Sequence, residues 1–140
     1  MIQQPDSELV KVFVYGTLKP GESNYQYYCG GKVVAATKAT VKGQLFALPV
    51  GYPAMVLGGG IVQGYLLTFN TPNILQHLDP LEGHDPQRPP DQNFYNRKQL
   101  EVYSAPEGEP LGLAWAYFMT LDQVEQIGGV LIPSGCWTGF

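Results

Sequence analysis

The sequence predicts an α+β fold built around a small closed β-barrel. Short runs rich in β-branched and aromatic residues recur along the chain and end at glycine or proline, as strands typically do. Glycines inside two of these runs, Gly43 and Gly64, favour the sharp bends of a closed barrel. Two short segments, near residues 71–82 and 120–127, carry helix signals. The chain has 140 residues, of which 44% are hydrophobic, and therefore suits one compact domain.

The first strand is predicted over residues 12–15, after a flexible leader at residues 1–10; the single domain is expected to occupy residues 11–140. The strand is short, β-branched and aromatic, and stops at glycine. The loop at 16–21 contains two glycines that permit unusual backbone angles and a proline without an N–H. Such a loop is either an ordinary turn or a concavity of backbone N–H groups that suits a carboxylate or an oxyanion.

A short helix is expected next, over residues 23–29, with Ser23 as its cap and two glycines after it. Residues 32–48 are rich in Val, Thr and Ala. This composition predicts one long bent strand, or two strands with a kink at Gly43.

Residues 49–53, with two prolines and a glycine, are expected to turn the chain. Residues 54–57 form a short strand candidate. The three glycines at 58–60 are predicted to make a hairpin turn into a further strand over residues 61–69. A phosphate-binding role for these glycines is not indicated, because the GxxxxGK[ST] pattern is missing.

The clearest helix begins at Thr71, the expected N-cap, with Pro72 as its first residue and leucines then recurring at helical spacing. Pro80 is expected to end or kink this helix, and Gly83 to close the turn. Glu82 would then lie where the helix carbonyls point, so the helix dipole is expected to raise its pKa. A carboxylate with a raised pKa suits a general base; the alternative is a solvated glutamate.

The polar, proline-rich residues 83–92 are predicted to lack regular structure and to form a lid over Glu82. Carboxylates and an imidazole gather around this segment, at Asp79, Glu82, His84 and Asp85. Their spacing matches no metal-ligand motif, so no metal is predicted.

The C-terminal third predicts an antiparallel hairpin, with strands over residues 94–103 and 111–119 joined by a solvated turn. Thr120 is expected to cap a short helix that stops at two glycines. Residues 130–140 are predicted to be a packed closing strand or loop.

Composition excludes several classes of function. Eight basic against twelve acidic residues give a net charge of −4, which offers no footprint for nucleic acid or an anionic membrane. No stretch approaches the roughly 20 apolar residues of a membrane span, and no signal peptide is indicated. Cys29 and Cys136 lie far apart, which suggests neither a disulfide framework nor zinc and favours a reducing cytoplasm. No serine lies in a recognised nucleophile motif, and Cys136 is expected to be a core residue.

Five short motifs occur in an order and spacing that resemble one family. They are Tyr15-Gly16-Thr17-Leu18 with Pro20-Gly21, Leu78-Asp79-Pro80-Leu81-Glu82-Gly83, Tyr95-Asn96-Arg97, Ala114-Trp115-Ala116-Tyr117 and Ser134-Gly135-Cys136-Trp137. Across most of the chain they resemble the γ-glutamylcyclotransferase-like (AIG2-like) family. The chain departs from that pattern in its extension before Lys11 and in the proline-rich residues 85–92.

The resemblance implies a small mixed or antiparallel β-barrel flanked by short helices, and an intramolecular acyl transfer. In that reaction the α-amino group of a γ-glutamyl amine or γ-glutamyl amino acid attacks its own γ-carbonyl, which forms 5-oxoproline and frees the amine. Glu82 is the implied general base. No cofactor or metal is implied, because the nucleophile belongs to the substrate and proximity supplies much of the rate.

The implied substrate contacts lie in two of the motifs. Tyr15, Gly16, Thr17 and Leu18 would hold either the α-carboxylate or the reaction oxyanion. Tyr95 would orient the substrate and Arg97 would pair with its charge, although both also fit a plain β-strand surface. Two further functions stay open: a non-catalytic small-molecule binding module of the same fold, and an enzyme that removes a γ-glutamyl protecting group from an amine natural product.

Overall fold

The computed structural model describes residues 9–16, 18–19 and 32–137. The predicted leader and the predicted helix at 23–29 lie outside these residues, apart from the last two residues of the leader. The elements in chain order are β1 (Val10–Val14), β2 (Val33–Ala47), β3 (Pro53–Phe69), α2 (Ile74–Leu81), the 3₁₀ turn η2 (Pro90–Gln92), β4 (Asn96–Ser104), β5 (Pro110–Phe118), α3 (Leu121–Ile127) and β6 (Val130–Ile132).

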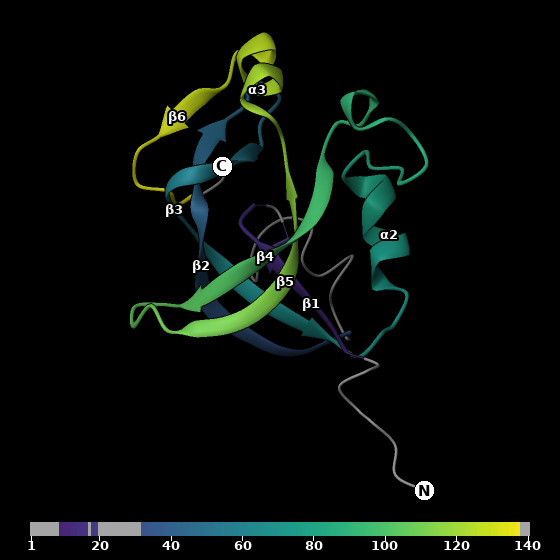
Figure 1. The fold of residues 1–140 in the computed structure, drawn as a ribbon, viewed down its shortest axis with the longest axis vertical. Helices are drawn as coiled ribbons and strands as arrows, with labels where there is room; N and C mark the ends of the chain where they lie inside the picture. Colours follow the sequence, from purple (N-terminus) through teal and green to yellow (C-terminus); the bar gives the residue numbers. More distant parts are fainter. Residues whose placement is uncertain (1–8, 17, 20–31, 138–140) are drawn as a thin grey trace, which may run out of the picture.

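Five strands form a closed barrel in the order β3-β1-β5-β4-β2, and the pairing of β2 with β3 closes it. β1 and β5 are parallel and the other barrel pairs are antiparallel, so the barrel is mixed. β6 pairs with β2 outside the ring. Figure 1 shows α2 beside the barrel and α3 at the end where β6 lies. The predicted α+β barrel with short flanking helices is confirmed.

β1 is buried on both faces. Val12 and Val14 pack in one core cluster with Ile74 of α2. Phe13 belongs to a second cluster made of residues from the barrel strands, and Tyr15, the residue after the strand, joins that cluster. Successive side chains point to opposite sides of a strand, so a strand covered on both sides needs a continuous apolar run. This explains why the strand was recognisable from the sequence.

The three glycines at 58–60 do not form the predicted hairpin turn; β3 runs through them as one strand. Across β2 and β3 the register passes from Lys42 opposite Ile61 directly to Gly43 opposite Leu57. Residues 58–60 are therefore extra residues on one strand, a large β-bulge. A bulge and a hairpin need the same local flexibility, and only the pairing partner distinguishes them.

Gly43 marks the bend on the opposite strand, as predicted. A Cβ there would lie 2.8 Å from the carbonyl oxygen of Val56, so only glycine lets the strands approach this closely. The chain reverses instead at the predicted turn before β3, where the Leu48 N–H donates to the Tyr52 carbonyl over 3.1 Å.

α2 starts later than predicted. Its N-cap is Asn73, with no side-chain cap, and the Ile74 N–H donates to the Thr71 carbonyl over 3.1 Å. Residues 71–73 thus form a turn before the helix instead of its first turn. Pro80 lies inside the last turn of α2, which continues to Leu81. A proline so near the end removes one backbone hydrogen bond without stopping the helix.

The hairpin and the capped helix predicted for the C-terminal third are confirmed. β4 and β5 form the expected hairpin. The Thr120 side chain accepts from the Gln123 N–H in a capping box, and Gly128 ends α3 with a left-handed φ of 94°. β6 is a short strand as expected, but Val130 and Leu131 are exposed, so the predicted packing is wrong for this strand, and Cys136 is half-buried and not a core residue. None of the helices in the described ranges is long and apolar enough to cross a membrane.

Candidate active site

Glu82 is the first residue after α2, and its backbone is held on both sides. Its N–H donates to the carbonyls of Leu78 and Asp79, each over 3.1 Å. Its carbonyl accepts from the Tyr95 N–H over 3.2 Å, which ties the helix end to the chain entering β4. Gly83 then turns the chain with a φ of 63°. The carboxylate is therefore carried on a fixed backbone.

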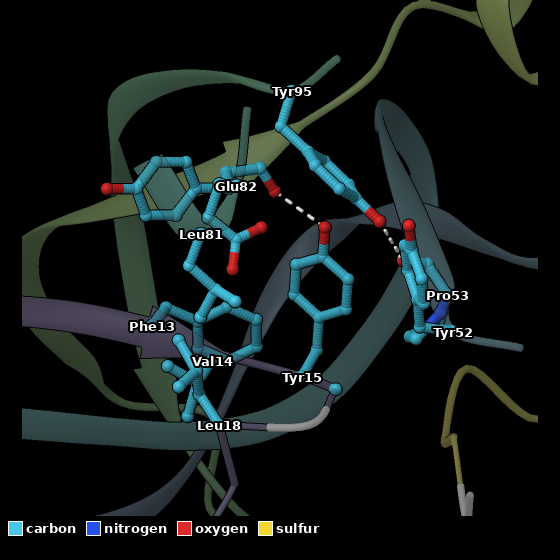
Figure 2. A pocket seen from close by; sticks show the side chains of 11 residues that line it. Phe13, Val14, Tyr15, Leu18, Tyr52, Pro53, Leu81, Glu82 and Tyr95 are labelled. Carbon is cyan, nitrogen blue, oxygen red and sulfur yellow. Dashed lines mark hydrogen bonds between the residues drawn. The ribbon is translucent and has the colours of Figure 1, made fainter. Parts of the chain in front are cut away.

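The Glu82 side chain borders a cavity of about 180 Å³. Figure 2 shows its carboxylate pointing inward, between Leu81 and Tyr15. The rest of the lining is apolar or aromatic: Phe13, Val14, Tyr15, Gly16, Leu18, Tyr52, Pro53, Leu81, Tyr95 and Tyr117. Among the described lining residues, Glu82 alone has an acidic or basic side chain at neutral pH. The cavity is smaller than the roughly 300–1,000 Å³ of sites that enclose a drug-sized ligand, so it suits one small group.

The three buried tyrosines that line the cavity all donate their hydroxyl hydrogens to other groups of the protein. Tyr15 donates to the carbonyl of Tyr117 over 2.6 Å and accepts from the Met55 N–H over 3.2 Å. Tyr95 donates to the carbonyl of Pro53 over 2.6 Å (Figure 2). The Tyr117 hydroxyl donates to Oδ1 of Asp79, also over 2.6 Å. What these hydroxyls have left for a ligand is acceptor lone pairs.

Burial raises the pKa of each of these phenols above its ordinary value, and the negative charge of Glu82 adds to the rise. At neutral pH the three are therefore uncharged. The described lining residues thus present one ionisable carboxyl surrounded by neutral groups of low polarity.

This environment makes Glu82 a weak acid. Burial, and secondly the negative charge of Asp79, raise its pKa from 4.5 to about 7. The direction expected from the sequence is correct, but the leading cause is burial and not the helix dipole. A carboxyl with a pKa near neutrality can take up and return a proton at physiological pH.

The loop after β1 contributes three described residues to the cavity: Tyr15, Gly16 and Leu18. Thr17, the fourth predicted contact of that motif, lies outside the described residues. A Cβ on Gly16 would lie 3.0 Å from Cγ of Pro53, so the loop backbone lies close against the start of β3. Tyr95 lines the cavity as well. The structure thus brings together Tyr15, Gly16 and Leu18 of the first motif with Glu82 and Tyr95.

Arg97 does not line the cavity. Its Nε lies 2.8 Å from Oδ1 of Asp79 and its Nη2 lies 3.1 Å from Oδ2, a two-bond ion pair. Its guanidinium also lies over the ring of Trp115, 4.8 Å from the ring centre. The charge partner of Arg97 in this structure is therefore a carboxylate of the protein, and a contact with substrate stays a prediction.

The proline-rich segment does not contribute to the cavity lining either. It folds onto Asn93, whose side chain accepts from the Asp85 N–H over 3.0 Å and from Nε of Arg88 over 2.8 Å. This closed loop lies beside the helix end that carries Glu82, so the predicted lid is wrong for this structure.

Sequence reasoning missed four aromatic or cyclic residues of the lining, Phe13, Tyr52, Pro53 and Tyr117. Tyr117 belongs to one of the five motifs, but strand alternation alone does not show which face of the sheet its side chain occupies. Within the described ranges, His, Cys, Asp and Glu side chains form no group of three or more that could hold a metal ion.

These features define a class of site: a small acid–base cavity on a β-barrel, with one carboxyl of near-neutral pKa and no side-chain nucleophile among its described lining residues. Comparison with known proteins gives the family. The model of the family described as Gamma-glutamyl cyclotransferase, AIG2-like, matches residues 12–139. The chain belongs to this family and is an enzyme of the γ-glutamylcyclotransferase type.

Two curated relatives and one solved structure show how far the similarity extends. The gamma-L-glutamyl-butirosin B gamma-glutamyl cyclotransferase of Niallia circulans is 32% identical over 113 residues, which cover 79% of this chain and 67% of that protein. A putative gamma-glutamylcyclotransferase of Vibrio cholerae is 32% identical over 128 residues, 90% of this chain and 93% of the relative. The crystal structure of an AIG2-like protein from Mus musculus superposes with a TM-score of 0.68 at 19% identity, over 94% of this chain and 89% of that one.

Proposed function

We propose that this enzyme converts a γ-glutamyl amine or γ-glutamyl amino acid to 5-oxoproline and the free amine, with Glu82 as the general base. The observation that carries the proposal is the carboxyl of Glu82, the single one among the described residues of the cavity lining, whose pKa burial raises to about 7. A base of this strength is half ionised at neutral pH, which is the condition for efficient proton transfer in both directions.

The reaction uses the substrate's own nucleophile. Glu82 removes a proton from the α-amino group, and the amine nitrogen forms a bond to the γ-carbonyl carbon. The tetrahedral intermediate then breaks its bond to the leaving amine, which takes the proton back from Glu82. Because amine and carbonyl belong to one molecule, folding the substrate in the cavity supplies much of the rate. No added oxidant, cofactor or metal is required by this sequence of steps.

The loop after β1 is the proposed site for the negative charge of substrate or intermediate. Gly16 and Leu18 line the cavity, and their backbone N–H groups would stabilise either the α-carboxylate or the oxyanion. Thr17 is proposed to share this role. Tyr15 and Tyr95 have acceptor lone pairs for the α-amino group and would orient it toward Glu82.

The size of the cavity supports a division of the substrate. About 180 Å³ suits the glutamyl group, and the amine half would then lie at the mouth. There Tyr52 is exposed and packs edge-to-face on Phe94, with ring centres 6.2 Å apart. An amine natural product is one candidate for that half, since a relative's name gives γ-glutamyl butirosin B as its substrate.

The proposed setting is the cytoplasm. Cys136 is a free thiol in the described part of the chain, which fits a reducing compartment.

The test is a mass-spectrometric assay for 5-oxoproline after incubation of the enzyme with γ-glutamyl amino acids, γ-glutamyl amines and ε-(γ-glutamyl)lysine. Release of 5-oxoproline with an equimolar amount of amine supports the proposal, and the preferred panel member identifies the amine half. Release of glutamate instead would mean hydrolysis by water and would overturn the cyclisation step. Saturable binding of a panel member without any product would favour a binding module.

A further inference from the structure

Asp79 is the point where α2 is fixed to the barrel. Its side chain is only 9% exposed although it is charged. Arg97 of β4 binds both carboxylate oxygens, at 2.8 and 3.1 Å, and the Tyr117 hydroxyl of β5 donates to one of them over 2.6 Å. Buried carboxylates require such partners, because an unpaired charge is costly away from water.

The backbone of the same residue holds the turn that carries Glu82. The carbonyl of Asp79 accepts from the Glu82 N–H over 3.1 Å and from the His84 N–H over 2.9 Å. Asp79 thus joins two strands of the barrel through its side chain and fixes Glu82 through its main chain. Tyr117, one of the side chain's two partners, also lines the cavity.

We propose that Asp79, bound by Arg97 and Tyr117, is a positioning residue of the active site, which fixes the turn that carries Glu82 and, through its ion pair, sets the net charge near that carboxyl. This inference rests on the proposed role of Glu82 as the base. It assigns to Arg97 a function that acts through Asp79 and needs no contact with substrate.

The charges around Glu82 support this role. Tyr15, Tyr95 and Tyr117 face Glu82 as neutral groups, so they contribute no net charge at neutral pH. Among the described residues, the charged groups that the test addresses are Asp79 on α2 and its ion-pair partner Arg97 on β4. His84 follows on the same turn, with its ring 6.3 Å from that of Tyr117, and is controlled separately.

Neutralising Asp79 and neutralising Arg97 should therefore shift the pH profile of kcat/KM in opposite directions. Asp79→Asn removes the negative charge and leaves the positive one, so Glu82 ionises at lower pH. Arg97→Gln leaves the negative charge of Asp79 without its partner, so Glu82 ionises at higher pH. We expect the acidic limb of kcat/KM to move by about one pH unit down and up respectively, which is about tenfold in rate on the acidic side.

Matched controls come from the proline-rich segment. Asp85→Asn and Arg88→Gln make the same two changes of charge on exposed residues whose side chains are engaged within that segment. Neither change should move the acidic limb, and His84→Gln should not reverse the order of the variants. Arg97→Lys keeps the charge without the two-bond geometry, so it should restore the limb to its wild-type position even where kcat stays lower.

Folding is checked for each variant by thermal unfolding, and Arg97→Lys keeps the test informative if Arg97→Gln does not fold. Opposite shifts, with rescue by lysine, support the inference. Shifts in the same direction, or no shift in any folded variant, overturn it and leave the ion pair a structural one. Glu82→Gln is assayed in parallel. If it keeps near-wild-type activity, the base assignment fails and this inference fails with it. If Glu82→Gln is inactive and the Asp79 and Arg97 variants show no shift of the acidic limb, the inference alone is overturned.

Discussion

The Tyr15 hydroxyl donates to the main-chain carbonyl of Tyr117 over 2.6 Å, although the two residues are 102 positions apart in the chain. The same hydroxyl accepts from the Met55 N–H, so one phenol joins the ends of β1 and β5 to the start of β3. One side chain of the cavity thus hydrogen-bonds two buried backbone groups that lie far apart in the chain. The tyrosines therefore both shape the cavity and hold its frame.

Tyr15→Phe should destabilise the protein more than Tyr95→Phe. The first change leaves a buried N–H and a buried carbonyl without their partner, whereas the second leaves only the Pro53 carbonyl. Each unsatisfied buried group costs about 1–3 kcal/mol, so the difference between the variants should be about 1–3 kcal/mol. Urea unfolding at pH 7 measures the free energy of unfolding of both variants. Equal losses, or a larger loss for Tyr95→Phe, would contradict the hydrogen bonds assigned to Tyr15.

Glu82→Gln should stabilise the folded protein at alkaline pH. A carboxyl whose pKa is raised from 4.5 to about 7 on folding contributes stability below pH 4.5 that is lost as pH rises through 7, which amounts to roughly 3 kcal/mol. Glutamine has no such charge. We expect the variant to be about 2–3 kcal/mol more stable than wild type at pH 8 and nearly equal at pH 4, as measured by urea unfolding at both values. A variant that is less stable at pH 8 would mean that the carboxylate is well solvated.

The acidic limb of kcat/KM should lie near pH 7. This limb reports the ionisation of the base in the free enzyme, which is Glu82 with its pKa of about 7. Initial rates at low substrate concentration between pH 5 and 9 locate it. A limb near the ordinary glutamate value of 4.5 would show that burial does not control this carboxyl.

Gly83→Ala should be markedly more destabilising than Gly108→Ala. Both glycines have a positive φ, 63° and 76°, so both substitutions carry backbone strain. At Gly83 the new Cβ would also lie 2.8 Å from Cβ of Phe94, whereas at Gly108 nothing lies within 4 Å. The added contact should cost about 1–3 kcal/mol more. Because Gly83 follows Glu82, we also expect a lower kcat in that variant alone, and similar behaviour of the two variants would argue against this packing.

Elements defined by local signals were predictable from the sequence. The apolar run of β1, the β4–β5 hairpin and the capping box at Thr120 all have signals within a few residues. The bulge at residues 58–60 has no such local signal, because three glycines permit a turn as readily as a bulge. Which one forms depends on how β2 pairs with both halves of β3, and this pairing is a long-range property of the barrel.

The candidate site was predictable in part for the same reason. Glu82 and the loop after β1 belong to recognisable motifs, and the structure brings them to one cavity. Tyr52 and Pro53 precede or begin a strand with no local sign of their role. The ion pair between Asp79 and Arg97 joins residues 18 positions apart, so no local signal indicates that Arg97 has a charge partner within the protein. Burial, which raises the Glu82 pKa, likewise exists only in the assembled barrel.

The most direct measurement is the rate of 5-oxoproline formation by Glu82→Gln relative to wild type, at pH 8 and on the substrate that wild type prefers. Glutamine keeps the size of the side chain and removes its ability to accept a proton from the amine. We predict that kcat/KM falls by about 10²–10⁴, the usual contribution of a general base, in a variant that is folded and at least as stable as wild type. A rate within a few-fold of wild type would show that another group accepts the proton and that Glu82 is not the base.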